Sequence, residues 1–240
     1  MSFITELKTV SGFEYYAFSD QDDFWEKDKL ISALRFISLN TTEHDNMLPI
    51  LYCSNLYEAD ENLNLIRTTN MGRLKHSLES VITRRNLSGC TMVFNEKLHS
   101  LVMEAEVTQA VLGHYHDSLL ESLCLSLGGK ILFDAEAHIY QREHSGNTSG
   151  VHATRNIFQR IRKELQHIRR GRGAEPETAL WLMGNFGDRL TPEARKTLEL
   201  VASCRESMIS RLKFVFSPKF STGDFRLTIF GKAKMLFGLL

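Results

Sequence analysis

The chain has 240 residues, of which 42% are hydrophobic and 10% aromatic, with 29 basic and 29 acidic side chains. This composition excludes a disordered protein, and the zero net charge excludes a chain-wide field that would attract nucleic acid. The length suits one substantial domain with an appendage. The four cysteines form no C-x-x-C pair, which argues against a zinc ribbon or a disulfide framework and favours a reducing compartment.

The amino-terminal residues lack the basic segment and apolar stretch of a secretory signal. No apolar stretch approaches the roughly 18 to 20 residues that a membrane-spanning helix needs. We therefore expect a cytoplasmic protein, with peripheral contact at the inner face of the cell membrane as an open alternative.

The first half of the chain predicts alternating helices and strands. A helical pattern over residues 2–11 ends at Gly12, and the aromatic run 15–18 predicts a buried strand. The acidic residues 19–23 would follow at the carboxyl end of this strand, before a helix predicted over 25–39. Further strands are predicted over 50–57 and 88–95, with a turn at 60–62 that leads to a short paired segment.

The second half continues this alternation and then changes character. Helices are predicted over 96–112 and 117–127, the latter stopped by Gly128 and Gly129, followed by a strand over 130–140 and a turn at 145–147. The fold class is therefore predicted as mixed α/β over residues 1–150. Residues 151–240 are predicted as a helical, basic tail, and its arginines lack the interleaved aromatic residues of an RNA-binding surface, which favours a solvated helix face.

The acidic segment offers a metal site. Asp20 and Asp22 flank one residue, and in an extended strand both carboxylates would point the same way. Mg²⁺ or Mn²⁺ held by two carboxylates keeps positions open for substrate phosphates, while Asp23 would hydrogen-bond within the loop. A helix cap or a solvated turn is the alternative for the whole segment.

Two histidine-containing segments are further candidates. Asp117 opens a predicted helix, where it would be a cap or a general base that takes a proton from a hydroxyl group. His114 and His116 lack a third nearby zinc ligand at a usual spacing. His144 lies in a polar turn, as a surface histidine or as a nitrogen ligand that would suit Mn²⁺.

Five segments in this order resemble the signatures of family 2 glycosyltransferases, in particular their bacterial rhamnosyltransferase-like branch. They are residues 18–25 (FSDQDDFW), 28–30 (DKL), 89–95 (GCTMVFN), 116–117 (HD) and 140–148 (YQREHSGNT). The likeness runs from residue 2 to about residue 150. Five signatures in order are more specific than any one of them.

The resemblance implies a partial GT-A fold and an inverting, metal-dependent transfer of a sugar, with rhamnose as one candidate. The donor would be a nucleotide sugar, and the acceptor a cell-surface polysaccharide or a lipid-linked saccharide. Asp20 and Asp22 would bind Mn²⁺ or Mg²⁺, Asp22 directly, with His144 completing the metal site, and Asp117 would be the catalytic base. The residues implied to contact donor or acceptor are Asp20, Asp23, Trp25, Gly89, Cys90 and His116.

The family's amino-terminal nucleotide-binding half, with its Thr-Tyr-Asn and Asp-Asp-Gly-Ser segments, has no counterpart in this sequence. We therefore expect a truncated enzyme. The alternatives are an inactive fragment kept for binding, one subunit of a split glycosyltransferase, and a metal-dependent hydrolase.

The segment 225–240 mixes apolar side chains with Arg226, Lys232 and Lys234. A basic amphipathic segment of this kind suits an anionic membrane surface near a lipid-linked acceptor. A helix docked on the rest of the protein is the alternative.

Overall fold

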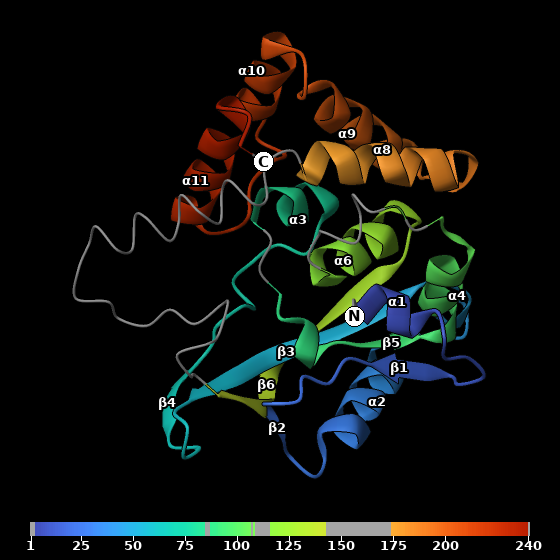
Figure 1. Cartoon of the computed structure of the whole chain (residues 1–240), viewed down its shortest axis with the longest axis vertical. Coiled ribbons are helices and arrows are strands. Elements are labelled where there is room, and N and C mark those ends of the chain that lie inside the picture. The colour runs from blue at the N-terminus through green and yellow to red at the C-terminus, as the bar shows by residue number, and fades with distance from the viewer. Residues whose placement is uncertain (1–2, 85–86, 107, 109–115, 143–173, 240) are drawn as a thin grey trace.

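The computed structural model describes residues 3–84, 87–106, 108, 116–142 and 174–239. A mixed sheet lies at its centre, with helix α2 (Lys29–Asn40) on one face (Figure 1). The other face carries four helices: α1 (Phe3–Leu7), α3 (Leu78–Arg84), α4 (Glu96–Glu104) and α6 (His116–Ser126). The predicted mixed α/β class is confirmed.

The sheet has six strands, five of which follow one another in the order β1-β5-β3-β6-β2. Their bounds are Tyr15–Ala17 for β1, Val93–Asn95 for β5, Ile50–Ala59 for β3, Lys130–Arg142 for β6 and Phe24–Trp25 for β2. A further strand, β4 (Leu65–Thr68), pairs with β3. β3 and β6 are parallel, with Ile50 opposite Lys130, and the other pairs are antiparallel. The long strands are therefore central, and the short β1 and β2 form opposite edges.

β3 is buried on both faces, because successive side chains of a strand point in opposite directions. Leu51 and Cys53 pack in the large core beneath α4 and α6. Ile50 and Tyr52 pack in a smaller core with Ala33 of α2. This explains the nearly continuous apolar run of β3, which is typical of a parallel strand covered on both sides.

The junction between α6 and β6 depends on two glycines. Gly128 has a φ of 78°, the left-handed conformation that ends many helices, which confirms the predicted stop. A Cβ atom on Gly129 would lie 2.4 Å from the carbonyl oxygen of Pro49. Only glycine at residue 129 therefore lets β6 start beside Pro49.

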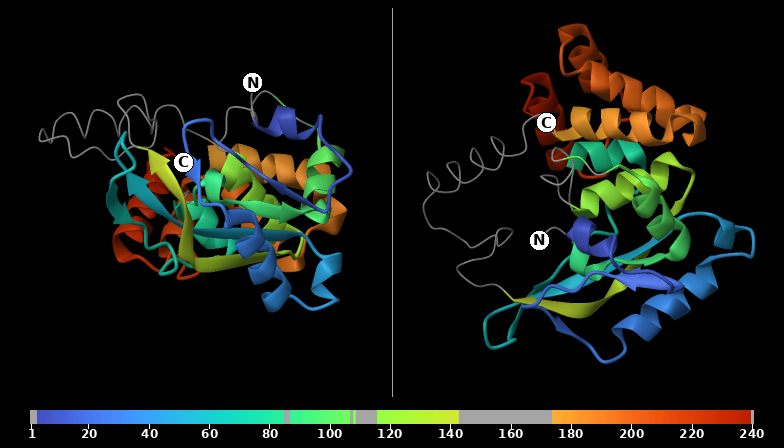
Figure 2. Two further views of the ribbon diagram at one scale, coloured as in Figure 1. Left: turned by 90° about the horizontal axis from the view of Figure 1, so that it is seen from below. Right: turned by 45° about the vertical axis from the view of Figure 1, so that its right-hand side comes forward.

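Four carboxyl-terminal helices form a further layer on α3 and α6, as the right-hand view of Figure 2 shows. They are α8 (Ala174–Phe186), α9 (Pro192–Ser203), α10 (Met208–Phe216) and α11 (Phe225–Leu236). Leu182, Leu198 and Phe214 are buried in the same core as α3 and α6. The predicted helical character is therefore confirmed for these residues, whereas the predicted division at residue 150 lies outside the described residues. Within the described part of the chain, no helix is both long and apolar enough to cross a membrane.

Several predicted element bounds were wrong. The helix predicted over 25–39 begins at Lys29, because Phe24 and Trp25 pair with Tyr140 and Ile139 as strand β2. The strand predicted over 88–95 consists of a 3₁₀ turn at Gly89–Thr91 followed by β5. The helices predicted over 2–11 and 96–112 end earlier, at Leu7 and Glu104.

Candidate functional site

The acidic segment 20–23 connects the two opposite edges of the sheet, since it follows β1 and precedes β2. The backbone N–H of Asp23 donates a hydrogen bond to the carbonyl oxygen of Asp20 at 3.4 Å. The segment is therefore a turn. The extended geometry that we assumed for the alignment of Asp20 with Asp22 was wrong.

The 3₁₀ turn before β5 lies against this acidic segment. Cys90 is buried, and its thiol donates a hydrogen bond to the Asp23 carboxylate. The Cys90 sulfur and one carboxylate oxygen each from Asp20 and Asp23 all lie within 4.8 Å of one another. Three side chains from two separate segments are thus brought together, although the sequence analysis had paired Asp20 with Asp22.

The first turn of α6 completes the cluster. The His116 ring contacts the rings of Phe3 and Phe18, with centroid distances of 4.6 and 4.7 Å. Oδ1 of Asp117 accepts a hydrogen bond from the backbone N–H of Ser118 at 2.7 Å. Asp117 lies close enough to Asp20 to help raise its pKa. The two predicted residues of α6 therefore belong to the same site as the acidic turn.

The need for glycine at position 89 follows from the His116 ring. A Cβ atom at residue 89 would lie 2.4 Å from Nε2 of His116. Because Phe3 and Phe18 hold the ring from two other directions, the ring has little room to move away. Gly89 therefore supports the site by letting the imidazole approach the backbone, rather than by presenting a side chain.

Trp25 and Lys29 form one wall of the cluster. Trp25 packs with Cys90 and Ile139, and the Lys29 ammonium group lies over its ring, 3.4 Å from the centroid. Lys29 is only 2% exposed, and its Nζ has no hydrogen-bond partner among the described residues. Burial lowers the pKa of Lys29 to about 8, although Cys90 and Asp23 oppose that change. A buried cation with unused donors is rare, and it faces the acidic turn.

Burial and mutual repulsion shape the electrostatics of the carboxylates. Burial, with smaller contributions from Asp20 and Asp22, raises the pKa of Asp23 to about 6, against the influence of Cys90 and Lys29. Burial likewise raises the pKa of Asp20, against the influence of His116. The pKa of His116 is lowered, mainly by burial, which favours the neutral imidazole. The cluster therefore concentrates several carboxylates, and Lys29 is the cation that acts on Asp23 among the described residues.

This donor set fits a hard divalent cation. Oδ2 of Asp23 is buried and has no hydrogen-bond partner among the described residues. Burial raises the pKa of the Cys90 thiol well above its ordinary value, so the sulfur stays protonated and serves as a hydrogen-bond donor. Two carboxylates without a thiolate are typical of Mg²⁺ or Mn²⁺ sites. Asp22 lies in the same turn and acts on the pKa of both neighbours, whereas the predicted ligand His144 lies outside the described residues.

Lys29 lies in the signature 28–30, but the sequence analysis gave it no role in the site. Its signal was present in the helical periodicity, because Lys29, Ala33 and Ile37 recur every four residues and form the buried side of α2. A lysine in an otherwise apolar stripe marks a buried cation. Its neighbour Asp23 lies six residues earlier in the chain, whereas its contact with Cys90 depends on the long-range fold.

Comparison with known proteins adds no assignment to this geometry. No protein-family model matches the chain, and no curated protein matches its sequence.

Proposed function

We propose that this chain is the metal and acceptor side of an inverting glycosyltransferase with a partial GT-A fold. It would transfer a sugar, with rhamnose as the first candidate, from a nucleotide-sugar donor to a cell-surface polysaccharide or lipid-linked acceptor. The observation that supports the proposal is the gathering of Asp20, Asp22 and Asp23 in one turn, with Asp117 close to Asp20 and with Oδ2 of Asp23 buried without a hydrogen-bond partner among the described residues.

The acidic turn would hold the donor diphosphate through a divalent cation. Asp20 and Asp23 are the best-placed ligands, and Asp22 adds negative charge beside them. When bound, Mg²⁺ or Mn²⁺ would neutralise the charge that develops on the diphosphate leaving group. Asp23 would remain ionised in the loaded site, because a bound cation favours the charged carboxylate.

The start of α6 would supply the base. The Asp117 carboxylate would take the proton of the attacking acceptor hydroxyl, and the Ser118 N–H keeps that carboxylate oriented. An inverting transfer needs one such base, because the hydroxyl attacks the sugar directly. His116, neutral and wedged between two aromatic rings, would position the backbone at residue 89 beneath the sugar.

The wall formed by Trp25 and Lys29 would select the donor. Lys29 offers a cation without a hydrogen-bond partner in the described structure, which suits a phosphate oxygen. Trp25 would hold Lys29 in place through its ring, and its buried Nε1, which has no hydrogen-bond partner in the described part of the chain, would donate a hydrogen bond to the nucleotide sugar. Cys90 closes the site beneath both residues.

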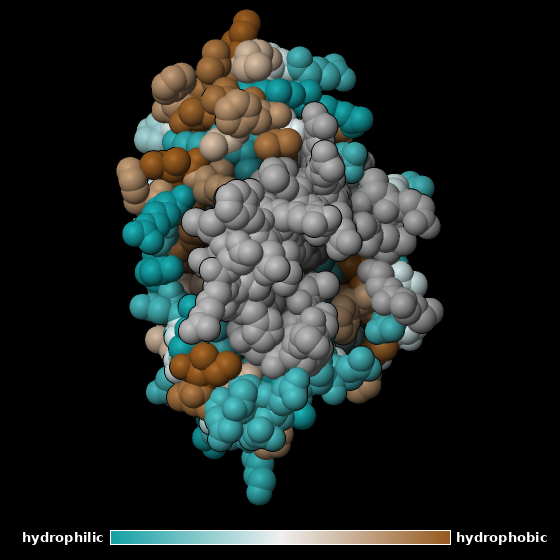
Figure 3. Space-filling model, turned by 60° about the vertical axis from the view of Figure 1, so that its left-hand side comes forward, coloured by the Kyte–Doolittle hydropathy of each residue, from teal (hydrophilic) through white to brown (hydrophobic). Residues whose placement is uncertain are grey.

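A lipid-linked acceptor would explain the apolar surface of the last two helices. Exposed apolar side chains follow α10 and α11, and brown atoms gather at the height of these helices in Figure 3. They are Met208, Ile209, Phe216, Phe225, Ile229, Phe230 and Phe237. α11 also packs on α3 and α10 through Gly231 and Met235, so docking and membrane contact use different sides of it. Neighbouring lysines would add attraction to an anionic leaflet.

Donor binding and turnover test the proposal directly. The full chain would be titrated with a panel of nucleoside diphosphate sugars, dTDP-rhamnose first, with Mn²⁺ or with EDTA. We expect binding only with Mn²⁺ for the wild type and a large loss of affinity in Asp23→Asn. Asp117→Asn should keep the binding but lower release of nucleoside diphosphate by roughly 10²- to 10⁴-fold.

Asp188→Asn is the matched control, since Asp188 is an exposed carboxylate on the turn after α8. It should behave as wild type in both measurements. Turnover that is unchanged in both Asp23→Asn and Asp117→Asn would overturn the assigned roles. If no nucleotide sugar binds either with Mn²⁺ or with EDTA, the chain would instead be an inactive fragment or one subunit of a split enzyme.

A further inference from the structure

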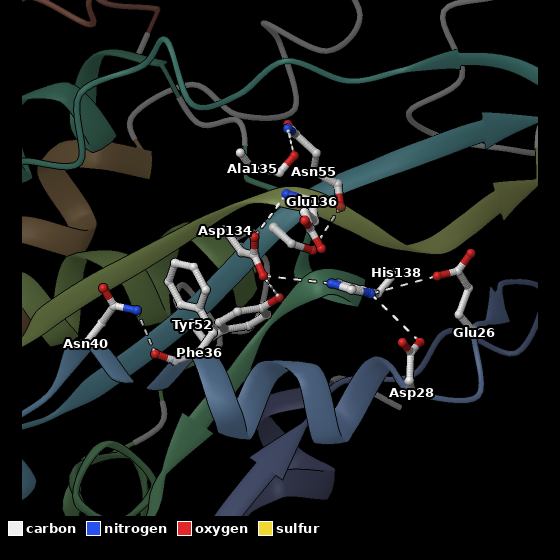
Figure 4. Close-up of polar contacts among 11 residues, drawn as sticks. Glu26, Asp28, Phe36, Asn40, Tyr52, Asn55, Asp134, Ala135, Glu136 and His138 are labelled. Carbon is white, nitrogen blue, oxygen red and sulfur yellow. Dashed lines mark hydrogen bonds and ion pairs between the residues drawn. The ribbon is translucent and has the colours of Figure 1, made fainter. Parts of the chain in front are cut away.

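A second group of metal-ligating side chains lies at the β2–β6 edge, on the face of the sheet opposite to the one that carries Cys90 and the acidic turn. It comprises Glu26 after β2, Asp28 before α2, and His138 on β6 (Figure 4). The Glu26 N–H donates to the His138 carbonyl oxygen at 3.1 Å, which fixes the two residues side by side. Their neighbours Trp25 and Ile139 point toward Cys90. Because adjacent strand residues face opposite ways, Glu26 and His138 point toward α2.

His138 is buried without a hydrogen bond. Its side chain is 9% exposed, and neither ring nitrogen has a hydrogen-bond partner among the described residues. Nδ1 lies 3.7 Å from Oε2 of Glu26 and 3.9 Å from Oδ1 of Asp28, which is too far for hydrogen bonds. A buried polar group without partners is costly, so the geometry calls for an atom between the ring and the two carboxylates.

The spacing of the three donor atoms suits a metal ion. All three lie within 4.8 Å of one another. Ligands that share a zinc ion, at bond lengths of about 2.0–2.2 Å, lie roughly 3.0–3.5 Å apart. Nδ1 of His138, at 3.7 Å from Glu26 and 3.9 Å from Asp28, therefore needs to approach the two carboxylates by only a few tenths of an ångström to share an ion with them.

A carboxylate behind the imidazole supports the same interpretation. Nε2 of His138 lies 3.8 Å from Oδ2 of Asp134, on the side of the ring opposite the two acidic ligands, and must also approach by several tenths of an ångström to donate a hydrogen bond. Asp134 is itself held by the Tyr52 hydroxyl at 3.0 Å and by the Glu136 backbone N–H at 2.9 Å. Histidine ligands usually donate their second ring N–H to such a carboxylate, which fixes the tautomer and strengthens the ligand.

We propose that Nδ1 of His138 and the carboxylates of Glu26 and Asp28 bind a divalent transition-metal ion, with zinc the best fit. A nitrogen ligand favours zinc over Mg²⁺ or Ca²⁺. Asp28 and Glu26 are 60% and 33% exposed, so water can fill the remaining coordination positions. The ion would fasten the two-residue strand β2 and the start of α2 to β6. This inference is independent of the proposed transfer reaction.

Zinc binding to the metal-free protein tests the inference. The measurements would use the full chain with Asp23→Asn and Cys90→Ser, which removes one carboxylate ligand and the adjacent thiol of the first group. We expect one saturable Zn²⁺ site, and Co²⁺ in its place should give visible absorption bands. His138→Gln should abolish this binding, and Asp134→Asn should weaken it roughly 10- to 100-fold. Glu136→Gln is the matched control, because its exposed carboxylate lies on the same strand outside the group, and it should bind zinc as before.

A second measurement does not depend on the folding of a variant. The ring signals of His138 in the wild-type protein, followed by NMR, should shift on addition of Zn²⁺ and report a neutral ring bound through Nδ1. Zinc binding of equal affinity in His138→Gln would overturn the inference. A His138 ring that stays doubly protonated and unchanged at saturating zinc would overturn it too, and would make the group an ion pair.

Discussion

Replacing Asp23 with asparagine should make the metal-free protein more stable at neutral and alkaline pH. Asparagine keeps the shape of the side chain but removes the charge that burial disfavours. If the Asp23 carboxylate stabilised the folded state, its replacement would instead make the protein less stable. The experiment therefore separates a site that is held at a cost in stability from one that supports the fold.

The size of the effect follows from the pKa of Asp23. Its folded value of about 6 lies above the ordinary value of 3.8. The folded state therefore binds the proton more tightly than the unfolded state, so stability is greatest below about pH 4 and falls as the pH rises to 6. At about 1.36 kcal/mol per pKa unit the full difference is about 3 kcal/mol. Partial exposure of the side chain reduces this figure, and we expect about 1–2 kcal/mol.

Urea unfolding in EDTA at a series of pH values between 4 and 8 measures this effect. The stability of Asp23→Asn relative to wild type should rise by about 1–2 kcal/mol from the lowest to the highest pH and stay level above pH 7. A variant that is less stable than wild type at pH 8 would refute the reasoning. It would mean that the bond from Cys90 and the attraction of Lys29 outweigh the burial of the charge.

Three further predictions concern other parts of the molecule. Gly89→Ala should displace the His116 ring, shift its NMR signals and destabilise the protein by about 1–3 kcal/mol. Gly184→Ala is its control, because residue 184 of α8 has open space around it, and this change should stabilise the protein by up to about 1 kcal/mol. Equal effects of the two variants on stability would contradict the contact at Gly89. Arg84 and Glu121 form a fully buried ion pair at 2.8 Å between α3 and α6. Glu121→Leu alone should therefore lower the free energy of unfolding in urea by about 3–5 kcal/mol, and adding Arg84→Met should restore most of it. An additive loss of stability in the double variant would show that the charges contribute more than their burial costs. For the proposed membrane contact of α10 and α11, the double variant Phe225→Ser, Phe237→Ser should bind phosphatidylglycerol vesicles roughly tenfold or more weakly in a sedimentation assay. Leu39→Ser on α2, at another exposed apolar residue, should bind them as wild type does. Equal binding of all variants would exclude the α10–α11 surface as the membrane contact.

Local patterns predicted the parts of the fold that local interactions determine. The sequence correctly predicted a strand from the aromatic run at β1, a strand from the apolar run of β3, and the end of helix α6 at Gly128. Helix α3 was missed, although Leu78, Val81 and Ile82 recur at helical spacing and are buried. Strand β2 could not be predicted, because two residues carry no period and their extended form comes from pairing with Tyr140 and Ile139.

The candidate site was predictable by residue type but not by arrangement. The acidic segment, Cys90 and Asp117 were singled out, and the structure brings them together. The sequence offered no means of choosing Asp23 over Asp22 as the partner of Asp20, since that choice depends on the turn at 20–23 and on the distant Cys90. His138 was passed over for the same reason, because its proposed fellow ligands Glu26 and Asp28 lie more than a hundred positions earlier in the chain.

The parallel pairing of β3 with β6 has a consequence during protein synthesis. Ile50 pairs with Lys130, so the apolar strand β3 leaves the ribosome about 80 residues before its long partner exists. At translation rates of about 5–20 residues per second, this interval lasts roughly 4–16 s. Until then β3 has only the short β4 and β5 beside it, and the edge that will pair with β6 is open to other chains. The nascent chain is therefore expected to need a chaperone during this interval, and slower translation before residue 130 should lower its soluble yield.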